Sequence, residues 1–91
     1  MKVVYHRGAL RDLQAIHSYI GRDDGNAARK VIARIEKSIG LLEGSPHIGR
    51  PGPQGVRLLS VPGLPYVVIH RIRGDAVSIV AVFHTSRNRQ F

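Results

Sequence analysis

Apolar residues recur every three to four positions in two stretches of the N-terminal half of the chain. The first stretch runs from Ala9 and stops at Gly21, a residue suited to a left-handed C-terminal helix cap. The second runs from Ala28 to Leu42 and ends at Gly44, after N-cap candidates at residues 23–26. We therefore expect two amphipathic helices, whose short connection predicts an antiparallel hairpin. Their apolar stripes consist of Leu10, Leu13, Ile16, Ile20, Ala28, Val31, Ile32, Ile35, Ile39 and Leu42.

Strand-like runs take up most of the remaining chain. Lys2–Tyr5 is a short strand candidate, and residues 45–55 predict a loop because Pro and Gly dominate them. Three longer runs follow, at Val56–Val61, Tyr66–Ile72 and Ala76–Thr85. The order strand, helix, helix and three strands predicts an α+β fold. In this fold the N-terminal strand and a three-stranded antiparallel meander form one small sheet, and the helical hairpin covers one face.

A two-residue turn at Gly74-Asp75 would fix which side chains of the last two strands share a face. This turn pairs Arg71 with Ser78, and strict alternation then separates two faces. The more apolar face, which should cover the helices, carries Tyr66, Val68, His70, Ile72, Val77, Ile79, Ala81 and Phe83. The other face, which we expect to be open to solvent, carries Val67, Ile69, Arg71, Arg73, Ser78, Val80, Val82 and His84.

The net charge of the chain and its distribution indicate which kind of partner the protein binds. The 91 residues suit one domain, 1–91, and contain 14 Lys+Arg against 6 Asp+Glu, a net charge of +8. The excess is concentrated in residues 50–91, where Asp75 is the single acid among six arginines, so an acidic partner is favoured. The lack of cysteine excludes disulfides and Cys-based zinc sites. No apolar run approaches the roughly 20 residues of a membrane helix, and we expect a cytoplasmic protein.

Candidate chemistry is limited to arginine and histidine. Arg71 and His84 on one open sheet face could hold a phosphodiester, with His exchanging a proton and Arg stabilising the transition state. A solvated basic rim explains the same residues and is favoured by residue types alone. His17 and His70 are expected to be packed, hydrogen-bonded structural residues. The chain has no phosphate-binding glycine loop and no histidine pair at ligand spacing, so we expect neither a metal nor a cofactor.

Several segments together resemble a known family. Residues 9–16 (ALRDLQAI) resemble the A-x-x-D-L-x-x-I first helix of the RelE/ParE toxin family. The likeness continues, in the expected order and over about residues 2–89, with Asn26-Ala27-Ala28, Leu42-x-x-x-Pro46-x-x-Gly49-Arg50, Gly55-Val56-Arg57-Leu58-Leu59 and Val82-Phe83-His84-x-x-Arg87. The resemblance implies the toxin half of a bacterial type II toxin–antitoxin pair, the kind of system that stabilises plasmids, with a cognate antitoxin as partner.

The family divides by target. RelE-like members are ribosome-dependent endoribonucleases, whereas ParE-like members poison DNA gyrase. The RelE-like nucleases carry an arginine where this chain has Val67, and lysines where Leu58 and Ser60 stand. The helix motifs and the 57–59 strand look more like ParE, so the resemblance implies a gyrase inhibitor that is not an enzyme. The alternative is a ribosome-dependent mRNA endoribonuclease whose candidate catalytic residues are Arg57, Arg71, His84 and Arg87.

We expect two binding surfaces, one for the target and one for the antitoxin. The target-binding candidates are Arg57, Arg71, Arg73, His84, Arg87 and Arg89. A disordered antitoxin tail with acidic and apolar residues could fold into apolar grooves along the helical hairpin. The candidate antitoxin-binding residues are Leu10, Leu13, Ile16, Ile20, Val31, Ile35 and Ile39. A third possibility, a nucleic-acid-binding module without toxicity, depends on the charge alone and would bind with steep salt dependence.

Overall fold

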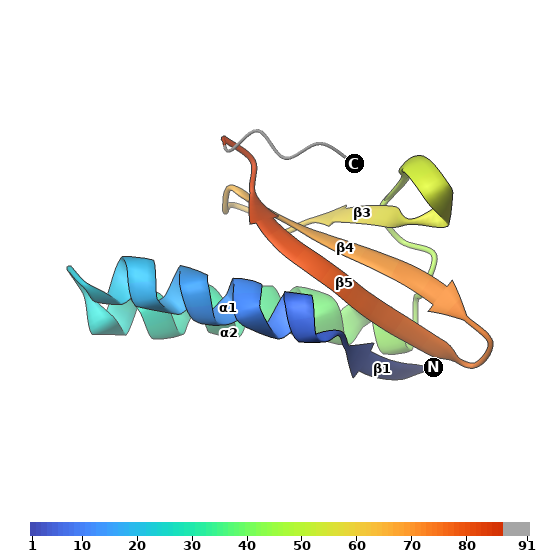
Figure 1. The fold of residues 1–91 in the computed structure, drawn as a ribbon, viewed down its shortest axis with the longest axis horizontal. Coiled ribbons are helices and arrows are strands. Elements are labelled where there is room, and N and C mark those ends of the chain that lie inside the picture. Colours follow the sequence, from blue (N-terminus) through green and yellow to red (C-terminus); the bar gives the residue numbers. More distant parts are fainter. Residues whose placement is uncertain (87–91) are drawn as a thin grey trace.

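Two antiparallel helices lie side by side against one face of a twisted sheet (Figure 1). The computed structural model describes residues 1–86. The elements are β1 (Lys2–Tyr5), α1 (Arg7–Gly21), α2 (Gly25–Gly40), the 3₁₀ turn η1 (Leu41–Glu43), β2 (Arg50–Pro51), the 3₁₀ turn η2 (Pro53–Gly55), β3 (Arg57–Ser60), β4 (Tyr66–Arg73) and β5 (Ala76–His84). The predicted α+β class is confirmed.

The sheet has the strand order β1-β5-β4-β3-β2. β3, β4 and β5 form the predicted antiparallel meander, and β1 adds to β5 in parallel. The predicted hairpin register is confirmed, since Arg71 pairs with Ser78 across a turn in which Gly74 has φ +58°. The expectation of a loop throughout residues 45–55 is wrong, because Arg50 and Pro51 pair with β3 as a short edge strand.

The helix ends differ in detail from the sequence-based boundaries. Gly21 is the last residue of α1 and does not form a left-handed cap; the right-handed backbone continues into Arg22, with φ −57°. Asp24 caps α2, since its Oδ1 accepts the backbone N–H groups of Asn26 at 3.0 Å and Ala27 at 3.1 Å. α2 ends at Gly40, and η1 then carries Leu42 into the core.

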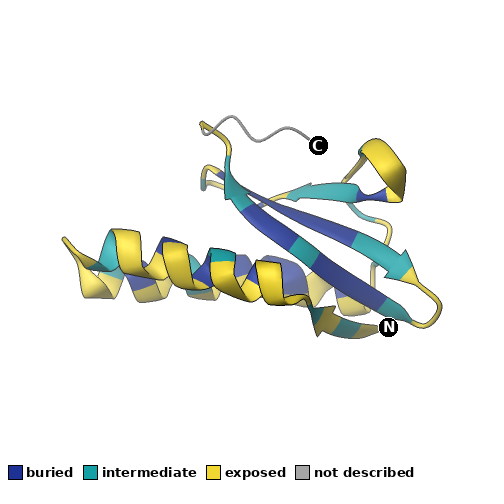
Figure 2. Ribbon diagram, viewed as in Figure 1, coloured by how far each residue is buried: buried dark blue, intermediate teal, exposed yellow. Residues whose placement is uncertain are grey.

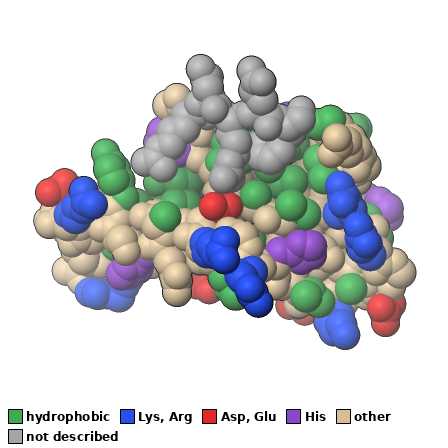
Figure 3. Space-filling view, in the orientation of Figure 1, with side chains coloured by type: hydrophobic (Ala, Val, Ile, Leu, Met, Phe, Trp, Pro, Cys, Tyr) green, Lys and Arg blue, Asp and Glu red, His purple; other side chains and the backbone are tan. Residues whose placement is uncertain are grey.

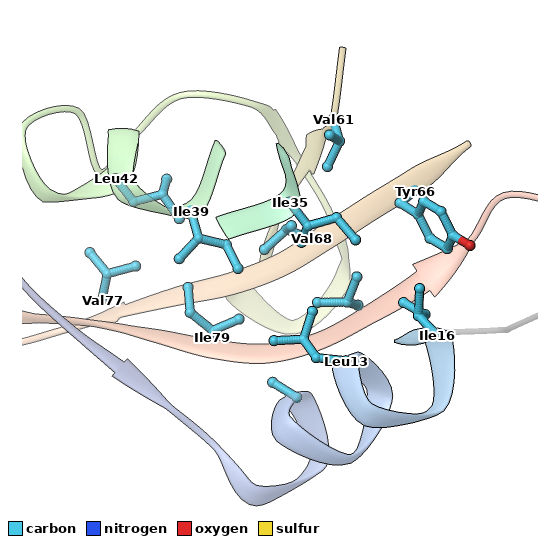
Figure 4. Packing of buried hydrophobic residues seen from close by; sticks show 12 residues of the cluster. Leu13, Ile16, Ile35, Ile39, Leu42, Val61, Tyr66, Val68, Val77 and Ile79 are labelled. Atoms are coloured by element: carbon cyan, nitrogen blue, oxygen red, sulfur yellow. The ribbon is translucent and has the colours of Figure 1, made fainter. Parts of the chain in front are cut away.

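The main core lies between the helices and the sheet (Figures 2 and 4). Both helices contribute one apolar stripe, and β4 and β5 contribute the residues that face them. Because each helix is exposed on its outer side, neither could bury its stripe without the sheet. The buried members are Ala9, Leu13, Ile16, Ile35, Ile39, Leu42, Val61, Tyr66, Val68, Val77, Ile79 and Val82.

A β-bulge in β5 changes which residues face the helices. Ile69 pairs with Ala81 but His70 pairs with Ile79, so Val80 is an extra residue. Beyond Val80 the alternation reverses, because one inserted residue moves every later side chain to the opposite face. Strict alternation was therefore wrong for the last part of β5. Val82 and His84 lie on the helix-covered face, whereas Ala81 and Phe83 lie on the other.

The first helix anchors this bulged strand. The Asp12 carboxylate of α1 accepts the backbone N–H of Val82 at 2.9 Å, and the backbone N–H of His6 donates to Ile79 O at 3.0 Å. Leu13, which follows Asp12 in the sequence, is buried in the core. The Asp-Leu pair of the first-helix motif therefore fixes α1 to β5 with one polar and one apolar contact.

The face opposite the helices is also largely buried, although the sequence predicted that it would be open. Val67 and Ile69 are 2% and 0% exposed, and Ser78 is buried as well. A second apolar cluster occupies this face and consists of Val56, Leu58, Ile69, Val80, Ala81 and Phe83. In the described part of the chain, no helix is both long enough and apolar enough to span a membrane.

Candidate functional site

The structure does not bring the candidate target-binding residues into one cluster. Arg57 pairs with His70 and therefore lies on the helix-covered side of the sheet, as does His84, which pairs with Tyr66. Arg71 and Arg73 lie on the opposite side. Arg71 is five positions along β4 from the residue that pairs with His84, roughly 17 Å at the usual strand rise. Arg87 and Arg89 lie outside the described residues.

The strand arginines bind the loop that precedes them. Arg57 Nη2 donates to Gly49 O at 3.0 Å, and Arg71 Nη2 donates to Gln54 O at 2.9 Å. The Nε atom of each guanidinium is buried without a hydrogen-bond partner among residues 1–86. Because the two acceptors are carbonyl oxygens, these contacts orient the guanidinium groups without neutralising their charge.

His84 is held at the end of β5. Its ring packs edge-to-face on Tyr66, with ring centroids 5.2 Å apart and an interplanar angle of 88°. Its Nδ1 accepts the backbone N–H of Ser86 at 3.1 Å. In the neutral ring this contact occupies the lone pair that a general base would use. His84 therefore needs a local rearrangement before it can accept a proton from a substrate.

His70 is the most buried histidine among the described residues. It is 0% exposed, and its Nε2 lies 3.2 Å from Pro46 O, which confirms the expectation of a packed, hydrogen-bonded residue. Nδ1 is buried without a partner in the described part of the chain. Burial lowers the pKa of His70, and the charges of Arg57 and His47 lower it further, against an opposing contribution from Pro46. The neutral ring is the form that the fold accommodates.

This burial predicts a pH-dependent stability. The unfolded chain protonates His70 at its ordinary pKa of about 6.5 and the folded chain resists it, so stability is lost as the pH falls through that value. Urea unfolding at about pH 7.5 and about pH 5 should show this loss, and His70→Gln should reduce it. His17 is exposed on α1, so the expectation that it is a packed residue is wrong. His17→Gln is therefore the control and should keep the wild-type loss. An unchanged loss in His70→Gln would contradict this account.

Most of the apolar candidates for antitoxin binding are core residues. Leu13, Ile16, Ile35 and Ile39 are each at most 8% exposed, so a partner cannot reach them without opening the fold. Ile20 and Val31 are partly buried against the core, and Leu10 is 48% exposed. Sequence reasoning did not single out Tyr19 and Leu41, which are large, exposed and apolar in character.

The sequence also did not predict a pocket of about 390 Å³. It lies between the C-terminal half of α2 and the end of β3, and its lining residues are Arg34, Lys37, Ser38, Leu41, Val61 and Pro62. Arg34 Nη2 donates to Pro62 O across its rim. The sequence does show two basic residues, Arg34 and Lys37, beside the apolar stripe of α2, but only the folded chain places Val61 and Pro62 next to them.

Among residues 1–86, no group of three or more His, Cys, Asp or Glu residues could hold a metal ion.

A known protein family matches almost the whole chain. Residues 3–89 match the family model described as the ParE toxin of the type II toxin–antitoxin system parDE. The chain belongs to the ParE toxin family. As a member of this family and of the wider RelE/ParE group, it is a toxin of type II toxin–antitoxin systems.

The proteins similar to this ParE-family toxin include one named for RelE and one from a ParDE system. Y4kP of Sinorhizobium fredii is 42% identical over 77 residues, covering 84% of this chain and 79% of that protein. Toxin RelE2 of Caulobacter vibrioides is 34% identical over 87 residues, covering 94% and 97%. A solved chain of the chromosomal ParDE toxin–antitoxin system of P. aeruginosa superposes with a TM-score of 0.84 and 26% identity, over 92% and 95% of the two chains.

Val67 occupies a buried position in this ParE-family toxin. It is 2% exposed and pairs with Phe83 on the face that carries the second apolar cluster. A cation at this position would lose its hydration, which is costly without an acidic partner. The environment of Val67 therefore suits the valine that this chain carries, and the arginine of the RelE-like nucleases would need a different setting.

Proposed function

We propose that this toxin acts by binding and inhibiting DNA gyrase, without catalysis, and that a cognate antitoxin neutralises it. The observation that carries the proposal is that Arg57, Arg71 and His84 do not converge. Arg71 lies on the sheet face opposite His84, and Arg57 pairs with His70, four positions along β4 from the residue that pairs with His84, roughly 14 Å at the usual strand rise. A nuclease must hold its base and its transition-state cation around one phosphate, within hydrogen-bond reach. A protein that acts by binding has no such requirement.

The uncompensated positive charge supports an acidic target and an acidic antitoxin. The chain carries a net charge of +8, and the contacts of Arg34, Arg57 and Arg71 described above are all to carbonyl oxygens. On the side of the molecule shown in Figure 3, Lys and Arg side chains are spread along the surface with apolar side chains among them. Spread charge of one sign accelerates encounter with extended acidic partners.

The test is a supercoiling assay with purified DNA gyrase. We expect the wild-type toxin to inhibit supercoiling or to trap cleaved DNA, and the purified antitoxin to reverse the effect. Arg73→Glu, at the exposed β4–β5 turn, should raise the toxin concentration needed for half-inhibition by about tenfold, equivalent to about 1.4 kcal/mol of binding free energy. Arg22→Glu, at the tip of the helical hairpin, is the matched control and should behave like wild type.

Gyrase that keeps its normal activity in the presence of folded, toxic protein would overturn the gyrase target. The 34% identity with toxin RelE2 favours one alternative, a ribosome-dependent mRNA endoribonuclease. Under the gyrase proposal, mRNA on stalled ribosomes should stay intact when the toxin is added. Cleavage by the wild type that is lost in His84→Ala would replace the gyrase proposal with the nuclease.

A further inference from the structure

The pocket beside α2 combines charge with exposed apolar surface. Arg34 and Lys37 supply two positive charges from successive turns of α2. Leu41, at the start of η1, is 55% exposed, although the other leucine of that turn, Leu42, is fully buried. Val61 closes the apolar part of the wall and is 2% exposed. A volume of about 390 Å³ is at the small end of the range for ligand pockets, roughly 300–1,000 Å³.

The charges of the pocket are available to a partner. The Arg34 guanidinium donates to the carbonyl oxygen of Pro62, which holds it at the rim but does not neutralise it. Lys37 is exposed in the last turn of α2. Exposed leucine next to two cations is the complement of a segment that carries a carboxylate beside an apolar side chain. A small organic acid without an apolar tail would use the two charges but would leave Leu41 uncovered.

We propose that this pocket binds an acidic and apolar segment of the antitoxin. A carboxylate lies between Arg34 and Lys37, and the neighbouring apolar side chain covers the exposed side chain of Leu41. This inference rests on the proposed neutralisation by an antitoxin, and it moves the recognition site away from the buried stripe residues of the hairpin. Such a segment can be unstructured before binding, because the pocket offers both the charge and the apolar contact that order it.

The experiment compares two variants of the full-length toxin that change its charge equally. Lys37→Glu with Leu41→Asp alters the pocket at two exposed positions and leaves the Arg34–Pro62 contact intact. Asn26→Asp with Arg29→Glu makes the same change of three charge units at exposed positions in the first turns of α2. Each variant is titrated with purified antitoxin encoded beside the gene of this chain, at low and high salt. Thermal unfolding confirms that both variants are folded.

We expect the pocket variant to bind the antitoxin at least about tenfold more weakly than wild type, and the control variant to bind like wild type. The salt dependence of binding should also change, because the favourable contact of Lys37 with the carboxylate is replaced by repulsion from the two introduced carboxylates, which salt screens. The pocket variant could instead bind as tightly as wild type, or no more weakly than the control variant. Either result would overturn the proposal that the pocket binds the antitoxin and would leave the neutralisation proposal standing. A wild-type toxin that does not bind the antitoxin would overturn both.

Discussion

Gly49→Ala should cost about 3 kcal/mol or more of the free energy of unfolding, measured by urea denaturation at neutral pH. Gly49 has φ +96°, a conformation in which a side chain adds backbone strain of roughly 1–3 kcal/mol. A Cβ here would also lie 2.4 Å from Leu58 O and 3.0 Å from Leu58 C, which adds an overpacking cost of about 1–3 kcal/mol. Leu58 cannot move away easily because it pairs with both Arg50 and Ile69.

Two other glycines separate backbone strain from steric clash. Gly55 also has a positive φ, +78°, but nothing lies within 4 Å of a Cβ placed there, so Gly55→Ala should cost only the strain, about 1–2 kcal/mol. Gly44 has φ −97° and equally open surroundings, so Gly44→Ala should cost nothing measurable. If Gly49→Ala were as stable as Gly44→Ala, the close approach of the 49–55 loop to β3 would be wrong.

The regular part of the fold could be predicted because its signals are local. Each helix presents apolar residues at helical spacing, and Asp24 stands where a cap is needed, so both helices are confirmed with ends shifted by a few residues. Gly74 similarly determines the β4–β5 turn through its positive φ, and the pairing of Arg71 with Ser78 follows from that turn. These residues specify their own backbone conformation without help from distant contacts.

The bulge at Val80 could not be predicted, because β5 has several β-branched residues and nothing local distinguishes Val80 from Val77, Ile79 or Val82. Two positions beyond the bulge, the backbone N–H of Val82 donates to the carboxylate of Asp12 on α1, 70 positions earlier in the chain. The effect on the candidate site was large. One inserted residue moved His84 to the face opposite Arg71 and removed the expected cluster of arginine and histidine.

The pocket beside α2 escaped prediction for a related reason. Arg34, Lys37 and Leu41 are visible in the sequence as residues off the apolar stripe, a position that usually means solvent exposure. They become a site only because the turn after β3 brings Val61 and Pro62 against α2, and this contact depends on the whole sheet. Residue type and spacing therefore identified the family, but the tertiary structure decided which charged residues stand together.

Ile35→Ala should cost about 2–5 kcal/mol of the free energy of unfolding, because it removes a fully buried side chain and leaves a cavity. Ile35 is 0% exposed and faces Val68 between α2 and the sheet (Figure 4). Leu10→Ala, on the outer side of α1, removes a side chain that is 48% exposed and should change stability by no more than about 0.5 kcal/mol. Urea unfolding of the two variants, compared with wild type, measures this difference.

The same pair of variants separates the structural from the binding role of the hairpin stripe. Because the proposed recognition site is the pocket beside α2, Leu10→Ala should bind the antitoxin like wild type, whereas Ile35→Ala should act through stability alone. Titration below the melting temperature of each variant keeps the two effects apart. A stable Ile35→Ala variant that binds the antitoxin more weakly would show instead that the helices open to expose Ile35 to the partner. Recognition would then use the buried stripe after all.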